Sequence, residues 1–133
     1  MKAFQFPKFQ KFIFIILAFA ASYHDILLAD SSISFYEGIK AYRNREYRDA
    51  ADWFNQSAKE GDVEAMFLLG RMHYDGSSLS INYVTALMWF ELAALRGLRS
   101  ARNYYRGLSK KMSQNEIQEA KKLAKEWNAS FKK

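Results

Sequence analysis

Residues 65–97 read AMFLLGRMHYDGSSLSINYVTALMWFELAALRG, and this stretch decides the fold. Apolar residues in its first part, such as Ala65, Leu69 and Met72, recur at steps of three and four, which indicates one face of a helix. Its second part places a Trp-Phe pair between alanines and stops at Gly97, a residue type that favours the backbone conformation found just after a helix. The stretch therefore predicts two helices joined by a turn.

The same pattern occurs once more upstream. At an offset of 32 residues, Phe35, Gly38 and Tyr42 recur as Phe67, Gly70 and Tyr74. At an offset of 36 residues, six residues recur in fixed order: Ala50, Trp53, Phe54, Ala58, Gly61 and Ala65 become Ala86, Trp89, Phe90, Ala94, Gly97 and Ala101. The difference of four is an insertion in the turn of the second copy. A repeat of this length is typical of helical pairs that stack and share one core, so we expect Trp53 and Trp89 to have similar surroundings.

Glycines mark two different positions in each copy. Gly61 and Gly97 are predicted to follow the ends of the second helices, where a left-handed backbone suits glycine. Gly38 and Gly70 are predicted to lie inside the first helices, where each costs about 1 kcal/mol relative to alanine. We expect a close approach to compensate: without a Cβ atom, the first helix can lie against the Trp-Phe pair of the second, and the flanking alanines make room.

The C-terminal part differs from both copies. Ala101 and Tyr105 begin a third unit, but Arg106 occupies the position of the helix glycine. Ser113 and Glu116 form a capping-box pattern that opens a last helix through Trp127. We predict repeat 1 over residues 32–61, repeat 2 over 62–97, and a partial repeat with a capping helix over 98–130.

Residues 65–97 resemble one full Sel-one-like repeat, a bacterial relative of the tetratricopeptide repeat. His73, Ser78, Leu79 and Asn82 depart from the family pattern but leave its spacing intact, while the first unit is closer to tetratricopeptide length. The resemblance covers roughly residues 32–127. It implies an all-α fold of about six helices, stacked as a short right-handed α-solenoid, that binds proteins and has no catalytic activity. The structural signature comprises Gly38, Ala50, Trp53, Phe54, Ala58, Gly61, Ala65, Gly70, Gly76, Ala86, Trp89, Phe90, Ala94 and Gly97.

The N-terminus has the pattern of a secretory signal peptide. Three lysines and no acidic residue precede ten apolar residues, 12–21. Ala18-Phe19-Ala20 supplies the small residues that signal peptidase reads, so we expect residues 1–21 to be removed by cleavage near 20–22, with Ala29 as a second cleavage position. The protein is then periplasmic or secreted. The alternative is an uncleaved segment that anchors the protein in the inner membrane.

Composition and motifs argue against an enzyme. The 133 residues suit a single domain, and the absence of cysteine excludes disulfides, thiolate metal sites and a cysteine nucleophile. The zincin, phosphate-loop and dinucleotide-binding patterns are missing from the sequence. His73 is predicted to be a partly buried helix residue rather than a metal ligand. No cofactor is expected.

Charge suggests two candidate surfaces. Residues 21–95 carry a net charge of −5, whereas residues 96–133 carry +8. The first helices offer partner contacts at Glu37, Lys40, Arg43, Arg71 and Asp75, and the surface is small enough that a short peptide or self-association is favoured. Alternatively, a row of arginines along the first helix of the third unit binds an anionic envelope surface, while nucleic acid is not expected for an exported protein. The row is Arg96, Arg99, Arg102 and Arg106.

Overall fold

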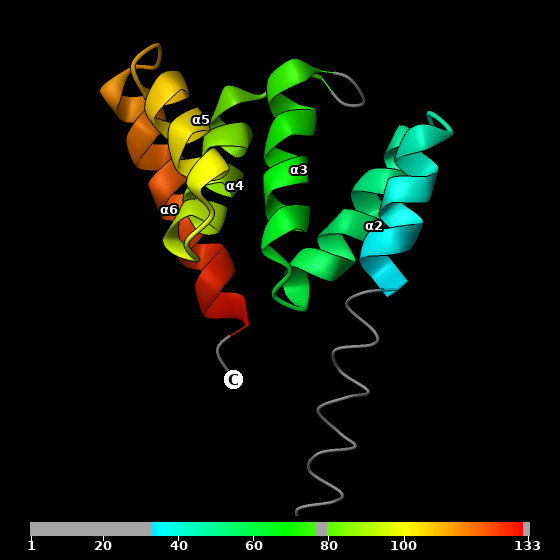
Figure 1. Ribbon diagram of the computed structural model, residues 1–133. Coiled ribbons are helices and arrows are strands. Elements are labelled where there is room, and N and C mark those ends of the chain that lie inside the picture. The colour runs from blue at the N-terminus through cyan, green and yellow to red at the C-terminus, as the bar shows by residue number, and fades with distance from the viewer. Residues whose placement is uncertain (1–32, 77–79, 132–133) are drawn as a thin grey trace, which may run out of the picture. The chain divides into compact units, whose positions relative to one another are not determined.

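The computed structural model describes residues 33–76 and 80–131, and all regular secondary structure in these ranges is helical (Figure 1). Residues 33–43 are helical and are followed by five further helices: α2 (Tyr47–Lys59), α3 (Val63–Asp75), α4 (Tyr83–Leu95), α5 (Arg99–Ser109) and α6 (Gln114–Ser130). The predicted all-α class and helical pairs are confirmed. The predicted signal peptide, residues 1–21, lies outside the described residues.

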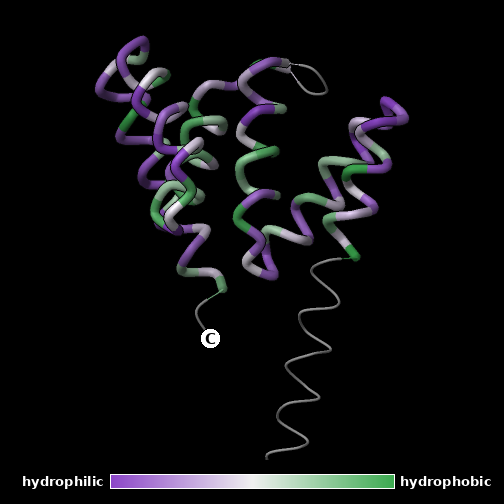
Figure 2. The backbone as a smooth tube through the Cα atoms, in the orientation of Figure 1, coloured by the Kyte–Doolittle hydropathy of each residue, from purple (hydrophilic) through white to green (hydrophobic). Residues whose placement is uncertain are grey.

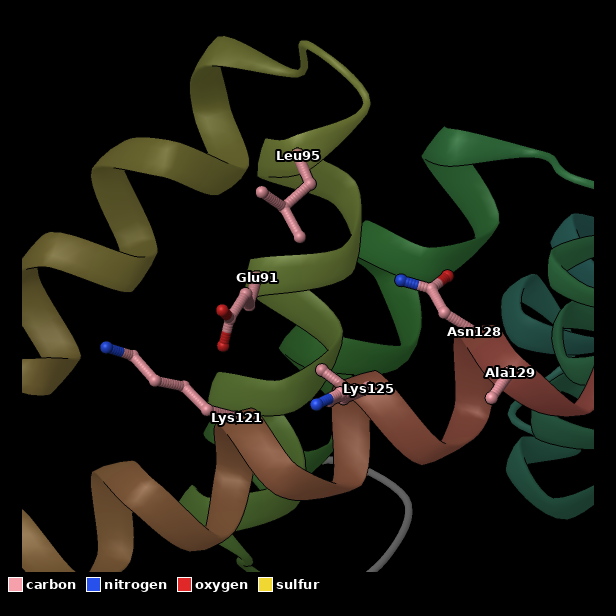
Figure 3. Close-up of a pocket in the computed structure, with 7 residues that line it drawn as sticks. Glu91, Leu95, Lys121, Lys125, Asn128 and Ala129 are labelled. Carbon is pink, nitrogen blue, oxygen red and sulfur yellow. The ribbon is translucent and has the colours of Figure 1, made fainter.

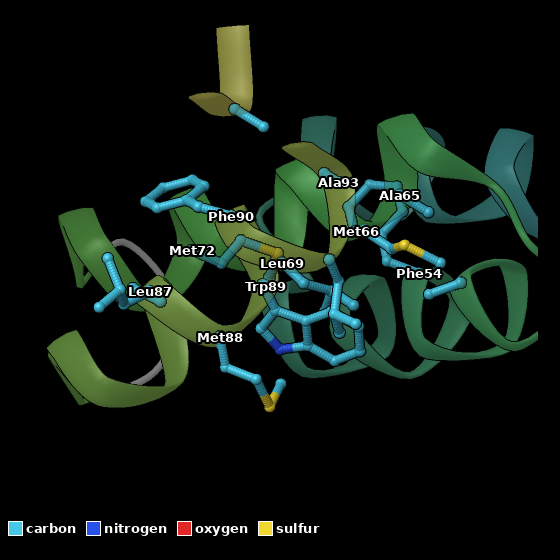
Figure 4. Close-up of a cluster of buried hydrophobic side chains, with 14 of the residues drawn as sticks. Phe54, Ala65, Met66, Leu69, Met72, Leu87, Met88, Trp89, Phe90 and Ala93 are labelled. Carbon is cyan, nitrogen blue, oxygen red and sulfur yellow. The ribbon is translucent and has the colours of Figure 1, made fainter. Parts of the chain in front are cut away.

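Helices α3, α5 and α6 pack around α4. Contacts join α2 to α3, α3 to α4, and α4 to both α5 and α6. Helix α4 is buried on most of its circumference, as expected for a helix covered by neighbours on several sides. In Figure 2, by contrast, hydrophilic and hydrophobic residues alternate along α3. The buried side chains form one continuous core, part of which is drawn in Figure 4.

The two internal glycines make the close approach that the sequence predicts. A Cβ atom added to Gly38 would lie 2.6 Å from the Phe54 ring, and one added to Gly70 would lie 2.6 Å from the Phe90 ring. Both phenylalanines are fully buried. The partner of each glycine is therefore the phenylalanine of the Trp-Phe pair.

The predicted helix ends are also confirmed. Gly61 and Gly97 have φ angles of 99° and 97°. After α4, the Gly97 N–H donates to the Ala94 carbonyl, and the next N–H, that of Leu98, donates to the Ala93 carbonyl. This pair of bonds satisfies carbonyls that the helix leaves unpaired. Ser113 and Glu116 form the predicted capping box at the start of α6.

Arg45 occupies the equivalent position after the helix of residues 33–43. Its φ angle is 65°, and the N–H groups of Arg45 and Glu46 donate to the carbonyls of Tyr42 and Ala41 in the same pattern. A side chain in this conformation costs about 1 kcal/mol, which glycine avoids. We predict that Arg45→Gly raises the free energy of unfolding by about 0.5–1 kcal/mol in urea titrations. Exposed Arg43→Gly, at the last position of the helix, is the control and is expected to lower the free energy of unfolding.

The two repeat tryptophans lie in unlike surroundings, contrary to expectation. Trp89 is 5% exposed, whereas Trp53 is 37% exposed. Trp89 is covered by α6, whose Trp127 ring lies 5.4 Å from it between centroids in an edge-on arrangement. The sequence repeat fixes the contact of glycine with phenylalanine within each pair, but the helix that covers Trp89 departs from the repeat.

Candidate functional site

Aromatic side chains join the first helices of the second and third pairs. Tyr104 of α5 lies with its ring centroid 5.4 Å from that of Phe67 and 5.8 Å from that of Tyr74, both on α3. It also lies 5.1 Å from the Phe90 ring, which fills the space left by Gly70. These contacts join side chains of α3 and α5 while Tyr104 stays 37% exposed.

A hollow of about 310 Å³ opens beside these rings and is here called the tyrosine groove. It is lined by Tyr74, Asn103, Tyr104, Gly107, Leu108 and Lys111. Such a volume suits a few side chains of a peptide, since ligand pockets begin at about 300 Å³. The sequence prediction did not include these residues. The consecutive tyrosines at 104 and 105 followed by Gly107 are a signal on an otherwise polar helix, but their pairing with Tyr74 depends on how the repeats stack.

The residues predicted to contact a partner lie on the first helices, and four of them form ion pairs within a single helix. The Lys40 ammonium lies 3.3 Å from the Glu37 carboxylate, and the Arg71 guanidinium lies 3.5 Å from the Asp75 carboxylate. Arg43 is exposed. Within the described ranges, the ion pairs do not link the helix of residues 33–43 to α3. Exposed pairs of this kind add less than about 1 kcal/mol to stability, so their side chains can turn to a partner at little cost.

Three of the four arginines in the predicted row lie on one helix, α5. Arg99, Arg102 and Arg106 are exposed on α5. The expectation that Arg96 lies on the same helix is wrong, because Arg96 is the C-cap residue that follows α4. Its guanidinium donates to the Leu92 carbonyl and to the Asn128 side chain, and it lies 5.8 Å from the centre of the Trp127 ring.

His73 is half-buried in α3, as predicted. Its Nδ1 atom is buried and has no hydrogen-bond partner, and burial lowers the pKa of the imidazole from its ordinary value of 6.5. Within the described residues, acidic and histidine side chains do not cluster as a metal site would require. In the same part of the chain, the helices lack the length and apolar character needed to cross a bilayer.

This burial predicts a pH dependence. As the pH falls through 6.5, the unfolded chain takes up a proton at His73 before the folded chain does, so the free energy of unfolding decreases. Phenylalanine cannot be protonated. We therefore expect His73→Phe to lose less free energy of unfolding than the wild type between pH 7 and pH 5. The measurement is the wild-type minus variant difference in urea unfolding across that range. A flat difference would contradict the placement of His73.

Comparisons with known proteins agree on the fold. The Sel1 repeat model matches residues 27–62 and 63–98. The chain is similar to the crystal structure of a protective antigen present in uropathogenic Escherichia coli strains, described as displaying an SLR fold, with a TM-score of 0.69 and 21% sequence identity. The match covers 77% of this chain and 23% of the antigen chain, so this chain spans about a quarter of its length. No curated protein matches the sequence.

Proposed function

The chain belongs to the Sel1 repeat family, and on that premise we propose that it is an exported module that binds a protein or peptide and has no catalytic activity. The tyrosine groove is the observation that carries this proposal. It places two tyrosines from two different repeats in one hollow, and one of them remains exposed. Tyrosine is enriched in the centres of binding interfaces because its ring packs while its hydroxyl still forms hydrogen bonds.

Charged side chains on the first helices would contribute to orienting the ligand. Glu37, Lys40, Arg43, Arg71 and Asp75 lie on the first helices, and their mixed signs suit a ligand segment with both acidic and basic residues. On this proposal the tyrosines supply most of the affinity, while the ion pairs select the register of the ligand. A short peptide or a second copy of the chain fits the small surface better than a large partner.

Capture of bound proteins by the exported chain, followed by affinity measurement with the captured partner, tests the proposal. Tyr104→Ala should weaken binding by about tenfold or more, as truncation of an interface tyrosine commonly does. Lys40→Ala with Arg71→Ala should weaken it less. The control is Arg48→Ala with Lys59→Ala, which removes the same charges from exposed positions on α2. Unchanged affinity of the Tyr104→Ala variant would refute the tyrosine groove as the binding site.

Export is tested separately by N-terminal sequencing of the protein recovered outside the cytoplasm. Cleavage near residues 20–22 is the expected result, because the small residues before that point fit signal peptidase. A start at Met1 would support the anchored alternative instead.

A second candidate function follows from α5. This helix carries exposed Arg99, Arg102 and Arg106 and contains no acidic residue. Such a helix can bind an anionic envelope surface electrostatically. Vesicles with anionic headgroups should then bind the protein at about 50 mM salt and release it at about 500 mM, where charges are screened over a few ångströms. Binding that is equal at both salt concentrations would exclude this role for the arginines.

A further inference from the structure

A second groove lies between α4, α5 and α6 and shares none of the residues that line the tyrosine groove. It consists of two adjoining hollows of about 340 and 390 Å³ that have Glu91, Leu95 and Lys121 in common. Lys125 of α6 belongs to the first hollow, and Arg102 of α5 belongs to the second. Figure 3 shows the Glu91 side chain leaving α4 on the side where Lys121 of α6 also projects, with Leu95 one turn further along α4.

Glu91 is the recessed polar group of this groove. Its Oε2 atom is buried and has no hydrogen-bond partner. Burial raises the pKa of this carboxyl group, and the positive charge of Lys121 opposes the shift. Glu91 does not form an ion pair within the residues described. Since a buried polar atom without a partner costs about 1–3 kcal/mol, a ligand that donates an N–H to Oε2 recovers free energy here.

The walls of the groove are positively charged. Lys121 and Lys125 lie one turn apart on α6, and Arg102 lies on α5. All three lack an ion pair in the described part of the chain, whereas the adjacent Lys122 lies 3.9 Å from Glu126. Three cations against one carboxylate favour a ligand that carries an anionic group.

These features together select the ligand. We propose that the groove binds an acidic peptide segment of a partner protein, with an aspartate or glutamate of the partner between Lys121 and Lys125 and a backbone N–H of the partner donating to Glu91. A peptide presents both groups within a few ångströms, because each acidic side chain is flanked by amide N–H groups. Leu95, which is 70% exposed, offers an apolar contact beside them. Anionic headgroups of a lipid surface could pair with the cations of the groove, but a flat surface would not bring a donor to the buried Oε2 atom of Glu91.

The test is a titration of the ¹⁵N-labelled 133-residue chain with a peptide blocked at both ends, in which two aspartates stand among alanines and leucines. We expect saturable shifts at residues 91–95 and 121–125, and none with the counterpart that has asparagines in place of aspartates. Lys121→Ala should weaken binding about tenfold, as for a charge-assisted hydrogen bond. The matched control, Lys122→Ala, removes the same charge from the neighbouring position and should change affinity less than about twofold.

The variant Glu91→Leu tests whether Glu91 accepts a hydrogen bond from the peptide or only repels its acidic groups. If Glu91 accepts a ligand N–H, this variant binds the acidic peptide several-fold more weakly, although it has lost a negative charge. Stronger binding would show that Glu91 only repels the peptide and would overturn the proposal. So would equal weakening by Lys121→Ala and Lys122→Ala, or shifts at Lys121 and Lys125 with anionic phosphatidylglycerol vesicles but not with the peptide. If Glu91→Leu fails to fold, the comparison of Lys121→Ala with Lys122→Ala still tests the proposal.

Discussion

Trp89→Ala is expected to lower the free energy of unfolding by about 3–5 kcal/mol, the range for truncating a large buried aromatic residue. The Trp89 indole is 5% exposed, lies on the most buried of the helices that the structure describes and packs edge-on against Trp127. Its loss leaves a cavity between α4 and α6 that neighbouring side chains cannot fill without moving. Urea unfolding followed by circular dichroism gives the value.

Trp53→Ala is the matched control, because Trp53 occupies the equivalent position of the first repeat. It is 37% exposed, so part of its surface already contacts water in the folded protein. We expect a loss of about 1–2 kcal/mol, in proportion to the smaller apolar area that it buries. Equal losses at the two positions would contradict the role assigned to α6 as the cover of Trp89.

Gly70→Ala is expected to destabilise the protein by about 1–2 kcal/mol, although alanine is the better helix former. The added methyl group would lie 2.6 Å from the Phe90 ring and 3.3 Å from the Ala86 carbonyl oxygen. The fully buried ring has little room to shift. Overpacking of about 1–3 kcal/mol therefore outweighs a propensity gain of about 1 kcal/mol.

Gly107→Ala is expected to stabilise the protein, in contrast to Gly70→Ala. Gly107 lies inside α5, and an added Cβ atom would meet nothing within 4 Å. This variant should gain about 0.5–1 kcal/mol from helix propensity alone. Combining Gly70→Ala with Phe90→Leu should cost less than the sum of the two single changes, because the smaller side chain frees the space that the methyl group needs. Stabilisation by Gly70→Ala would rule out the close approach.

Features set by local sequence were predictable. The closing glycines at 61 and 97, the Ser113 capping box and the close approach at Gly38 and Gly70 each depend on residues within one helical pair. Repetition at a fixed offset made the pairs visible, since two copies of a chain segment with the same pattern fold in the same way.

Features set by packing between pairs were not predictable in the same way. The different exposure of Trp53 and Trp89 depends on α6, which departs from the repeat pattern. The tyrosine groove needs Tyr74 and Tyr104 to meet across two repeats, and the second groove, around Glu91, needs α4, α5 and α6 together. Arg96 followed the spacing of the arginine row, but the turn at Gly97 separates it from α5.

The most direct test of a shared interior is whether the first repeat unfolds together with the rest. In one variant Trp53 is the sole tryptophan, with phenylalanine at 89 and 127, and in a second variant Trp53→Phe leaves the other two. Each variant's fluorescence transition in urea is compared with its own circular dichroism transition. Our account predicts coincident midpoints in both variants, because Ala58, Ala65 and Met66 continue one core from α2 into α3. A Trp53 transition at lower urea than the loss of helix would show that the helical pairs are separate units.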